Sequence, residues 1–220
     1  MPKTAVVAGS TGLVGNHLIQ ILAQSHEYEA VIALVRKGSN VIYDGVFTVE
    51  VDYHRLADFA ENLQADDVYC CLGTTMKKAG SKASFYQVDY TFPFELAMIA
   101  GKNGSARFNI VTASGANSAS LFYYNRVKGD IEKAIMKLNI PNINIFRPSL
   151  LLGNRSEKRM GEQVGAAIAK LMNPVMLGRL RRYRAIKGAN VAKAMYRVSQ
   201  LDKTGAQIYE SDKIYEISQD

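Results

Sequence analysis

A tyrosine four residues before a lysine can do acid–base chemistry when both lie on one helix. Residues four apart are neighbours on a helix surface, and a nearby ammonium lowers the pKa of a phenol from its usual value of about 10. Such a tyrosine can pass a proton to a carbonyl oxygen while a nicotinamide cofactor supplies a hydride. The chain contains this spacing three times, at Tyr124/Lys128, Tyr183/Lys187 and Tyr209/Lys213.

Position along the chain separates the three pairs. Tyr124 and Lys128 fall on a helix expected directly after the fifth strand, whereas the other two pairs fall in an expected cap and in the tail. Hydroxyls stand just upstream in VTASGANSAS, with Thr112 twelve residues and Ser114 ten residues before the tyrosine. A hydroxyl there can hold a substrate oxygen. We therefore predict that these four residues are catalytic, the alternative being a solvated helix face that carries the spacing by chance.

Three glycines follow the first apolar stretch in VVAGSTGLVGNHL, at positions 9, 12 and 15. Between a strand and a helix, Gly9 permits a sharp turn, Gly12 lets the backbone approach a pyrophosphate, and Gly15 lets the helix pack closely. Free N–H groups at the helix start then face the phosphates. The spacing differs by one residue from G-x-G-x-x-G, and a plain strand–helix turn is the alternative. The residues predicted to hold a dinucleotide here are Gly9, Ser10, Thr11, Gly12, Leu13, Val14 and Gly15.

The second expected strand ends at Val35 and is followed by Arg36 and Lys37. An NAD site usually has an acidic side chain at this point, which binds the ribose 2′-hydroxyl, whereas arginine suits a 2′-phosphate. NADP(H) is therefore expected in preference to NAD(H), with a solvated loop arginine as the alternative. The topology adds further expected cofactor contacts, which are Asp52 near the adenine and Leu72, Gly73 and Thr74 along the ribose.

Short β-branched runs alternate with longer helical patterns, which favours a parallel sheet with helices on both faces. Strands are expected at 4–9, 30–35, 47–51, 67–72, 108–113, 143–146 and 205–210, and helices at 13–23, 55–62, 84–103, 119–138 and 189–200. The predicted fold is an α/β, doubly wound parallel sheet of the Rossmann type, in a single domain over 1–220. The looser pattern after Pro148 predicts a small cap over 149–185, with an apolar helix around 162–172.

The bulk properties narrow the function classes. The chain has 220 residues, 48% of them apolar and 21% charged, as in an ordinary soluble domain, and it contains no apolar run long enough to cross a bilayer. No signal peptide is apparent and the adjacent Cys70 and Cys71 cannot easily pair, so a cytoplasmic location is expected. The three histidines form no cluster with cysteines or carboxylates, so no metal site is predicted. The net charge of +7 suits an anionic ligand, and no nucleic-acid partner is expected, although GRLRRYR (178–184) sets a tyrosine among arginines.

Three longer segments resemble one known family. CCLGTTMKKAGSKASFYQVDY (70–90), FNIVTASGANSASLFYYNRVKGDIE (108–132) and IFRPSLLLGNRSEKRMGE (145–162) resemble the Tat-interacting-protein branch of the atypical short-chain dehydrogenase/reductases. The likeness runs from the glycine loop through the expected cap. It implies a Rossmann fold, bound NADP(H) and a hydroxyl–Tyr–Lys active site, with Tyr124 as proton donor and Lys128 as its partner.

The resemblance also implies roles for single residues. The branch usually has serine where this chain has Thr112, which keeps the hydroxyl, and Ser114 is the second choice. Arg147, Pro148 and Ser149 resemble the segment that lines the nicotinamide carboxamide. Asp89 stands where related reductases often carry asparagine, and we expect it to be structural.

Together these observations predict an NADP(H)-dependent oxidoreductase of the carbonyl reductase or alcohol dehydrogenase type that acts on a small molecule. The alternative is a regulatory or interaction protein that senses NADP(H) without turnover, since some members of the resembling family are discussed as regulators. An intact hydroxyl–Tyr–Lys set favours the enzyme. The chain is expected to be a monomer, or a homodimer through helices 84–103 and 119–138 as in relatives, without a membrane partner.

Overall fold

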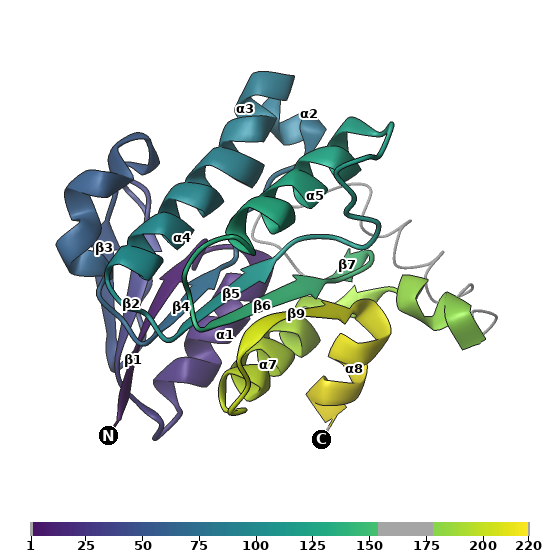
Figure 1. Cartoon of the computed structure of the whole chain (residues 1–220). Coiled ribbons are helices and arrows are strands. Elements are labelled where there is room, and N and C mark those ends of the chain that lie inside the picture. The colour runs from purple at the N-terminus through teal and green to yellow at the C-terminus, as the bar shows by residue number, and fades with distance from the viewer. Residues whose placement is uncertain (1, 154–177, 220) are drawn as a thin grey trace.

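The computed structural model describes residues 2–153 and 178–219, and its centre is a seven-stranded sheet (Figure 1). Every pairing of neighbouring strands in this sheet is parallel. From one edge to the other the strands are β3 (Val46–Glu50), β2 (Tyr28–Val35), β1 (Lys3–Ala8), β4 (Asp67–Cys70), β5 (Arg107–Val111), β6 (Asn142–Arg147) and β9 (Gly205–Glu210). The predicted doubly wound parallel sheet is therefore confirmed, and all seven predicted strands are present.

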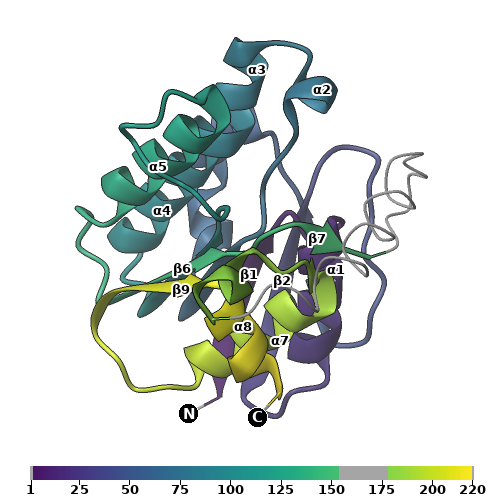
Figure 2. The same ribbon diagram turned by 90° about the vertical axis from the view of Figure 1, so that its right-hand side faces the viewer.

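Helices cover both faces of the sheet (Figure 2). One face carries α1 (Leu13–Ala23), α7 (Gly188–Ser199) and α8 (Ser211–Gln219), and the other carries η1 (Tyr53–Leu63), α4 (Phe92–Lys102) and α5 (Tyr123–Ile135). Each face has its own apolar core, and successive residues of β1 alternate between the two. Ala5 and Val7 belong to the core beneath α1 and α7, whereas Val6 and Ala8 belong to the core beneath α4 and α5. This double burial explains why the strands have continuous apolar runs.

The helix predicted over 84–103 is divided in the structure. It consists of α3 (Lys82–Tyr86), one π-helical turn η2 (Gln87–Thr91) and α4, and a further short helix, α2 (Met76–Ala79), precedes it. Side-chain caps set the first boundaries, since Thr75 accepts the Lys78 N–H and Ser81 accepts the Ser84 N–H. These caps and the π turn are local deviations that apolar periodicity does not reveal.

The helix predicted over 119–138 begins later, at Tyr123. Side chains satisfy backbone N–H groups in the preceding loop, because the Asn117 Oδ1 accepts from Ala119 and the Ser120 hydroxyl accepts from Phe122. Such local bonds compete with helix formation. The loop is nevertheless held close to α5, where a Cβ on Gly129 would lie 2.1 Å from the Ser118 nitrogen.

The region of the expected cap is described only at its ends. A small two-stranded sheet pairs β7 (Leu151–Leu152) with β8 (Ile186–Lys187), and η3 (Gly178–Tyr183) precedes β8. The apolar helix predicted around 162–172 lies outside the described residues, so the extent of the cap stays a prediction. Among the described residues, no helix has the length and apolarity needed to cross a membrane.

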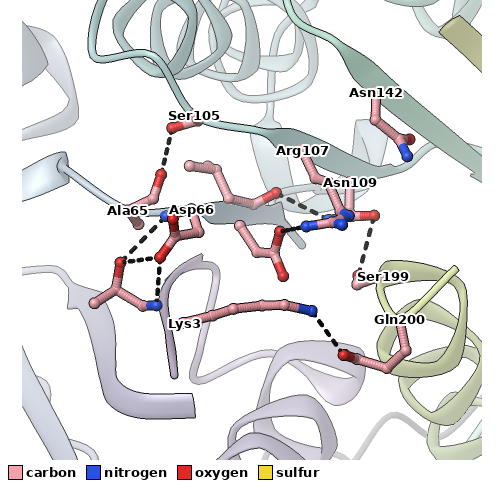
Figure 3. Close-up of polar contacts among 12 residues, drawn as sticks. Lys3, Ala65, Asp66, Ser105, Arg107, Asn109, Asn142, Ser199 and Gln200 are labelled. Atoms are coloured by element: carbon pink, nitrogen blue, oxygen red, sulfur yellow. Dashed lines mark hydrogen bonds and ion pairs between the residues drawn. The ribbon is translucent and has the colours of Figure 1, made fainter. Parts of the chain in front are cut away.

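Polar side chains cross the amino-terminal ends of the central strands (Figure 3). The Lys3 ammonium donates to Gln200 Oε1 over 2.8 Å, and the Ser199 hydroxyl lies 3.4 Å from Asn109 Oδ1. Ser199 ends α7, whereas Asn109 lies in β5. These bonds therefore attach α7 to the sheet at the end opposite to the glycine loop.

Candidate active site

The glycine loop lies where the strand order reverses. In chain order, β1, β2 and β3 run from the centre of the sheet to one edge, and β4, β5, β6 and β9 then run from the centre to the other edge. In doubly wound sheets, ligands bind beyond the carboxyl ends of the strands at such a reversal. The loops after β1 and β4 meet there, since the Cys71 N–H donates to the Ala8 carbonyl over 2.8 Å.

Two of the three glycines have no room for a side chain. Gly9 has φ +77°, and a Cβ on it would lie 2.6 Å from the Cys71 carbonyl oxygen. A Cβ on Gly15 would lie 2.2 Å from the Gly9 carbonyl oxygen, so α1 packs directly against the turn. The tight turn and the close helix packing predicted for these positions are therefore present.

The start of α1 fits a phosphate group. Gly12 is the N-cap and brings no capping side chain, and the first turn contains no acidic residue. The first hydrogen bond of the helix runs from the Asn16 N–H to the Gly12 carbonyl over 2.9 Å. The earlier N–H groups of the helix have no carbonyl one turn behind them, and they carry partial positive charge. The backbone thus offers what a dinucleotide pyrophosphate requires.

The side chains of this loop have other partners. The Ser10 hydroxyl is buried and donates to the Leu34 carbonyl over 2.9 Å, and Val14 belongs to the core. The Leu13 side chain packs against Gly188 and Gly153, because a Cβ on either glycine would lie 2.6 Å from one of the Leu13 side-chain carbons. Ser10, Leu13 and Val14 can therefore contact a cofactor through their backbone, while Thr11 is exposed.

The remaining predicted cofactor residues lie along the same carboxyl edge. Arg36 and Lys37 are exposed directly after β2, and no described carboxylate forms an ion pair with Arg36. Asp52 follows β3, where its carboxylate caps η1 by accepting the His54 N–H over 2.9 Å. Leu72, Gly73 and Thr74 follow β4, and Gly73 is exposed.

Of the three Tyr-x-x-x-Lys pairs, Tyr124 and Lys128 share a single helix, α5. Tyr183 ends η3 while Lys187 lies in β8, and Tyr209 is buried in β9 while Lys213 lies in α8. Neither of these two pairs therefore has the one-helix arrangement that the chemistry requires. Tyr124 is half-buried and packs against Phe85, with ring centroids 5.5 Å apart.

Lys128 is a buried cation with a buried partner. Its side chain is 5% exposed, and its Nζ lies 2.7 Å from Oδ1 of Asp89, whose side chain is fully buried. Burial disfavours the ammonium, but the charge of Asp89, with a contribution from Tyr124, outweighs it and raises the pKa of Lys128. Asp89 was expected to be structural, and sequence reasoning missed its contact with the lysine. Its one signal was a single acidic residue within the aromatic-rich run FYQVDYTF.

The two candidate hydroxyls differ in their surroundings. Thr112 is buried, and its hydroxyl donates to Glu132 Oε1 over 2.6 Å. Glu132 also accepts from Arg147, whose Nη1 donates to Glu210 over 3.0 Å. The single proton of the Thr112 hydroxyl is thus used within this buried network.

Ser114 is half-buried and borders a pocket of about 210 Å³. Its N–H donates to the Pro148 carbonyl over 2.9 Å, which holds the loop after β5 against the end of β6. The pocket is lined by Ser114, Gly115, Ala116, Asn117, Arg147, Arg182, Tyr183 and Glu210. Ser149 faces elsewhere, since its hydroxyl donates to the Arg184 carbonyl. The pocket is mostly polar, and neither Tyr124 nor Lys128 is among the residues that line it.

The doubly wound sheet and the glycine turn are those of a nucleotide-binding class of protein, and the sequence matches one such class, the NAD dependent epimerase/dehydratase family. The chain matches that family over residues 5–200 and belongs to it. Among the described residues, no group of three or more metal-binding side chains is present. The family match supports a nicotinamide cofactor.

Particular relatives are similar over much or all of the chain. Protein HTATIP2 of Rattus norvegicus is 32% identical over 164 residues, which cover 73% of this chain and 67% of that protein. Protein FMP52-1, mitochondrial, of Scheffersomyces stipitis is 30% identical over 223 residues, which cover 97% and 98% of the two chains. These relatives confirm the resemblance to the Tat-interacting-protein branch.

Solved structures agree on the fold. The Bordetella bronchiseptica enzyme WbmH in complex with NAD+ is 15% identical with a TM-score of 0.72, and the match covers 100% of this chain and 80% of that one. UDP-glucose 4-epimerase of Thermotoga maritima, with UDP-glucose, is 13% identical with a TM-score of 0.71, over 98% and 81% of the chains. At such identities the likeness concerns the fold alone.

The prediction of a cytoplasmic location is wrong, since it is contradicted by several relatives. FMP52 relatives from Candida glabrata, Meyerozyma guilliermondii and Candida albicans, at 30–35% identity, are named as mitochondrial proteins. Free cysteines occur in proteins of several compartments, so they could not decide the location.

Proposed function

We propose that this protein is an NADP(H)-dependent oxidoreductase that interconverts a small carbonyl compound and the corresponding alcohol. The observation that carries the proposal is the pairing of Tyr124 with a buried, charged Lys128 on one face of α5. A buried ammonium is costly, and its position one helical turn from a half-buried phenol suits proton transfer. A protein that only bound the cofactor would need the phosphate and ribose contacts but not this pair.

The proposed reaction divides the work among three side chains. A nicotinamide cofactor held by the glycine turn would supply a hydride for the carbonyl carbon. Tyr124 donates its phenolic proton to the carbonyl oxygen, so the C=O π electrons become the new O–H bond. Lys128 stabilises the phenolate that remains, and it would hold a ribose hydroxyl of the cofactor. Ser114 donates a hydrogen bond that orients the carbonyl oxygen, because the hydroxyl of Thr112 is already bonded to Glu132.

The preference for NADP(H) rests on Arg36 and Lys37. Both are exposed directly after β2, where the 2′ substituent of the adenosine ribose would lie, and no acidic residue immediately follows the strand. A planar guanidinium binds a phosphate through two parallel hydrogen bonds. The segment over 149–185 is proposed to cover the substrate, with Arg182 and Tyr183 on the pocket wall.

A second candidate function is a sensor that binds NADP(H) without turnover. One observation favours it, namely that the hydroxyl at the position expected for catalysis, Thr112, is engaged with Glu132. If Ser114 does not replace it, the site lacks its third catalytic group. The two candidates differ in turnover but not in cofactor binding.

The test uses Tyr124→Phe and purified protein with a panel of aldehydes and ketones. We expect the variant to lose at least about 100-fold in turnover, the usual contribution of a positioned proton donor, while its thermal stabilisation by NADPH is unchanged. Saturation to about a hundred times Kd stabilises a protein by roughly 2.7 kcal/mol. Unchanged turnover would refute the assignment of Tyr124, and tight NADPH binding without any turnover in the unmodified protein would favour the sensor. Repeating the thermal assay with NADH measures the cofactor preference.

A further inference from the structure

Asp89 lies in an unusual backbone segment. It occupies the single π-helical turn η2, between α3 and α4, and its side chain is fully buried. A π turn inserts a residue into a helix, changes the direction of the side chains around it, and often occurs at functional sites. Here it directs a carboxylate from the α3–α4 segment toward Lys128 on α5.

The two oxygens of Asp89 hold two different parts of the site. Oδ1 lies 2.7 Å from Lys128 Nζ, and Oδ2 accepts the Thr74 N–H over 2.9 Å. Thr74 belongs to the loop after β4 that is predicted to follow the cofactor ribose. Gly73 of the same loop lies against the pair, because a Cβ on it would lie 3.5 Å from Oδ1 and 3.8 Å from Nζ. One carboxylate therefore joins the lysine to the cofactor loop.

The charges around Lys128 come from three elements. Asp89 faces it from η2, Tyr124 from its own helix, and Cys70 from β4. Burial raises the pKa of the Cys70 thiol to about 12, so this group is neutral at working pH. Among the described residues around Lys128, Asp89 is thus the source of negative charge.

We propose that Asp89 is a positioning residue that keeps Lys128 charged while the site is at work. The proposal rests on the proposed function. A negative charge 2.7 Å from a buried ammonium opposes loss of its proton, whereas burial without a counter-charge favours the neutral amine. A charged Lys128 stabilises the phenolate that Tyr124 becomes once it has given up its proton, and a neutral amine does not. Asp89 therefore extends the reduction to higher pH.

The decisive variant is Asp89→Asn, which keeps the size of the side chain and removes its charge. We expect the upper limb of the pH profile of kcat/KM for reduction to move to lower pH by about one unit or more, as for loss of an adjacent opposite charge. The direction follows because losing Asp89 eases deprotonation of Lys128.

The matched control is Asp130→Asn. Asp130 is half-buried on the same helix, two residues from Lys128 and therefore on a different side of α5. This variant should leave the profile in place. Asp89→Glu restores the charge and should move the upper limb back toward its original pH, even if the Thr74 contact is weakened, which separates a charge effect from a general structural defect.

A second measurement does not depend on turnover. In protein with 13C-labelled lysine, the Lys128 Cε resonance, identified by its absence in Lys128→Gln, reports the protonation of the ammonium directly. We expect it to titrate at lower pH in Asp89→Asn than in the unmodified protein. Identical titration in the two proteins, or an unmoved reduction profile, would overturn the inference. If no substrate is turned over but the Cε titration moves, the proposed function fails while the role of Asp89 in holding the lysine proton stands.

Discussion

At the scale of single residues, the hydroxyls of Thr112 and Ser114 have different surroundings and therefore different expected roles. Thr112 donates to Glu132, which is 2% exposed and also binds Arg147. A buried carboxylate needs every donor around it, because an unsatisfied charged group is expensive. Ser114 borders the pocket instead. We therefore assign Thr112 to stability and Ser114 to the proposed chemistry.

The two hydroxyls should respond differently to removal. Thr112→Val keeps the shape of the side chain but deprives Glu132 of a donor, so we expect a loss of about 1–3 kcal/mol in the free energy of unfolding with little change in turnover per folded molecule. Ser114→Ala should lower turnover by about 100-fold or more, as when one oriented donor to a reacting oxygen is removed, with little change in stability. Urea unfolding and steady-state kinetics on both variants measure this. Equal losses of turnover would contradict the division.

At the scale of the elements, the β1–α1 unit depends on contacts between backbone atoms. The turn at Gly9 brings its carbonyl beneath the helix, and Gly15 leaves that carbonyl room. The helix start is thereby aimed at the position of the cofactor phosphates. A side chain at Gly15 would have to displace the turn itself, since backbone atoms are in the way.

Gly15→Ala should therefore damage both the fold and cofactor binding. Its Cβ would lie 2.2 Å from the Gly9 carbonyl oxygen, and overpacking of this kind costs about 1–3 kcal/mol or more. We expect a lower midpoint of thermal unfolding and weaker stabilisation by NADPH. Gly101→Ala is the control, because this helical glycine has its nearest neighbour, Ile140 Cγ1, at 3.4 Å. A Gly15→Ala protein that bound NADPH as before would show that the close packing is not needed.

At the scale of the whole molecule, polar groups join the sheet to the helices at the end opposite to the site. Asp67 is fully buried at the start of β4, where the Tyr28 hydroxyl donates to it over 2.5 Å and Arg107 over 3.0 Å. Tyr69, in the same network, donates to Ser199 of α7 over 2.8 Å. The two layers are therefore linked by directional bonds as well as by apolar packing.

This arrangement predicts a pH dependence of stability. Burial raises the pKa of Asp67 above its usual value, although the bonds from Tyr28 and Arg107 oppose the shift. The folded protein thus holds the proton more tightly than the unfolded chain, and this contribution to stability is complete below about pH 4 and is lost as pH rises through the folded pKa. The free energy of unfolding relative to Asp67→Asn should therefore fall as pH rises from about 4. Urea unfolding across that range measures the slope, and a rise would contradict it.

The strands, the two-sided sheet and the glycine turn could be predicted because local patterns encode them. β-branched apolar runs bounded by turns predicted each strand, and the sequence order of strands and helices predicted the parallel sheet. The turn at 9–15 was recognisable because only glycine fits its backbone. The division of 84–103 into α3, η2 and α4 was not predictable from periodicity, because the buried contact of Asp89 with α5 involves residues far apart in the chain.

The sequence by itself determined the fold and the tyrosine–lysine pair. Two residues that are four positions apart on one helix keep the same spatial relation whatever surrounds the helix. Only the tertiary structure decided which hydroxyl is available and what compensates the charge of Lys128. Those answers depend on Glu132, twenty residues from Thr112, and on Asp89, in a different helical segment from Lys128. The physical reason is that helical spacing is set by local backbone geometry, whereas the partner of a buried polar group is whichever group the packed layers bring within hydrogen-bond distance.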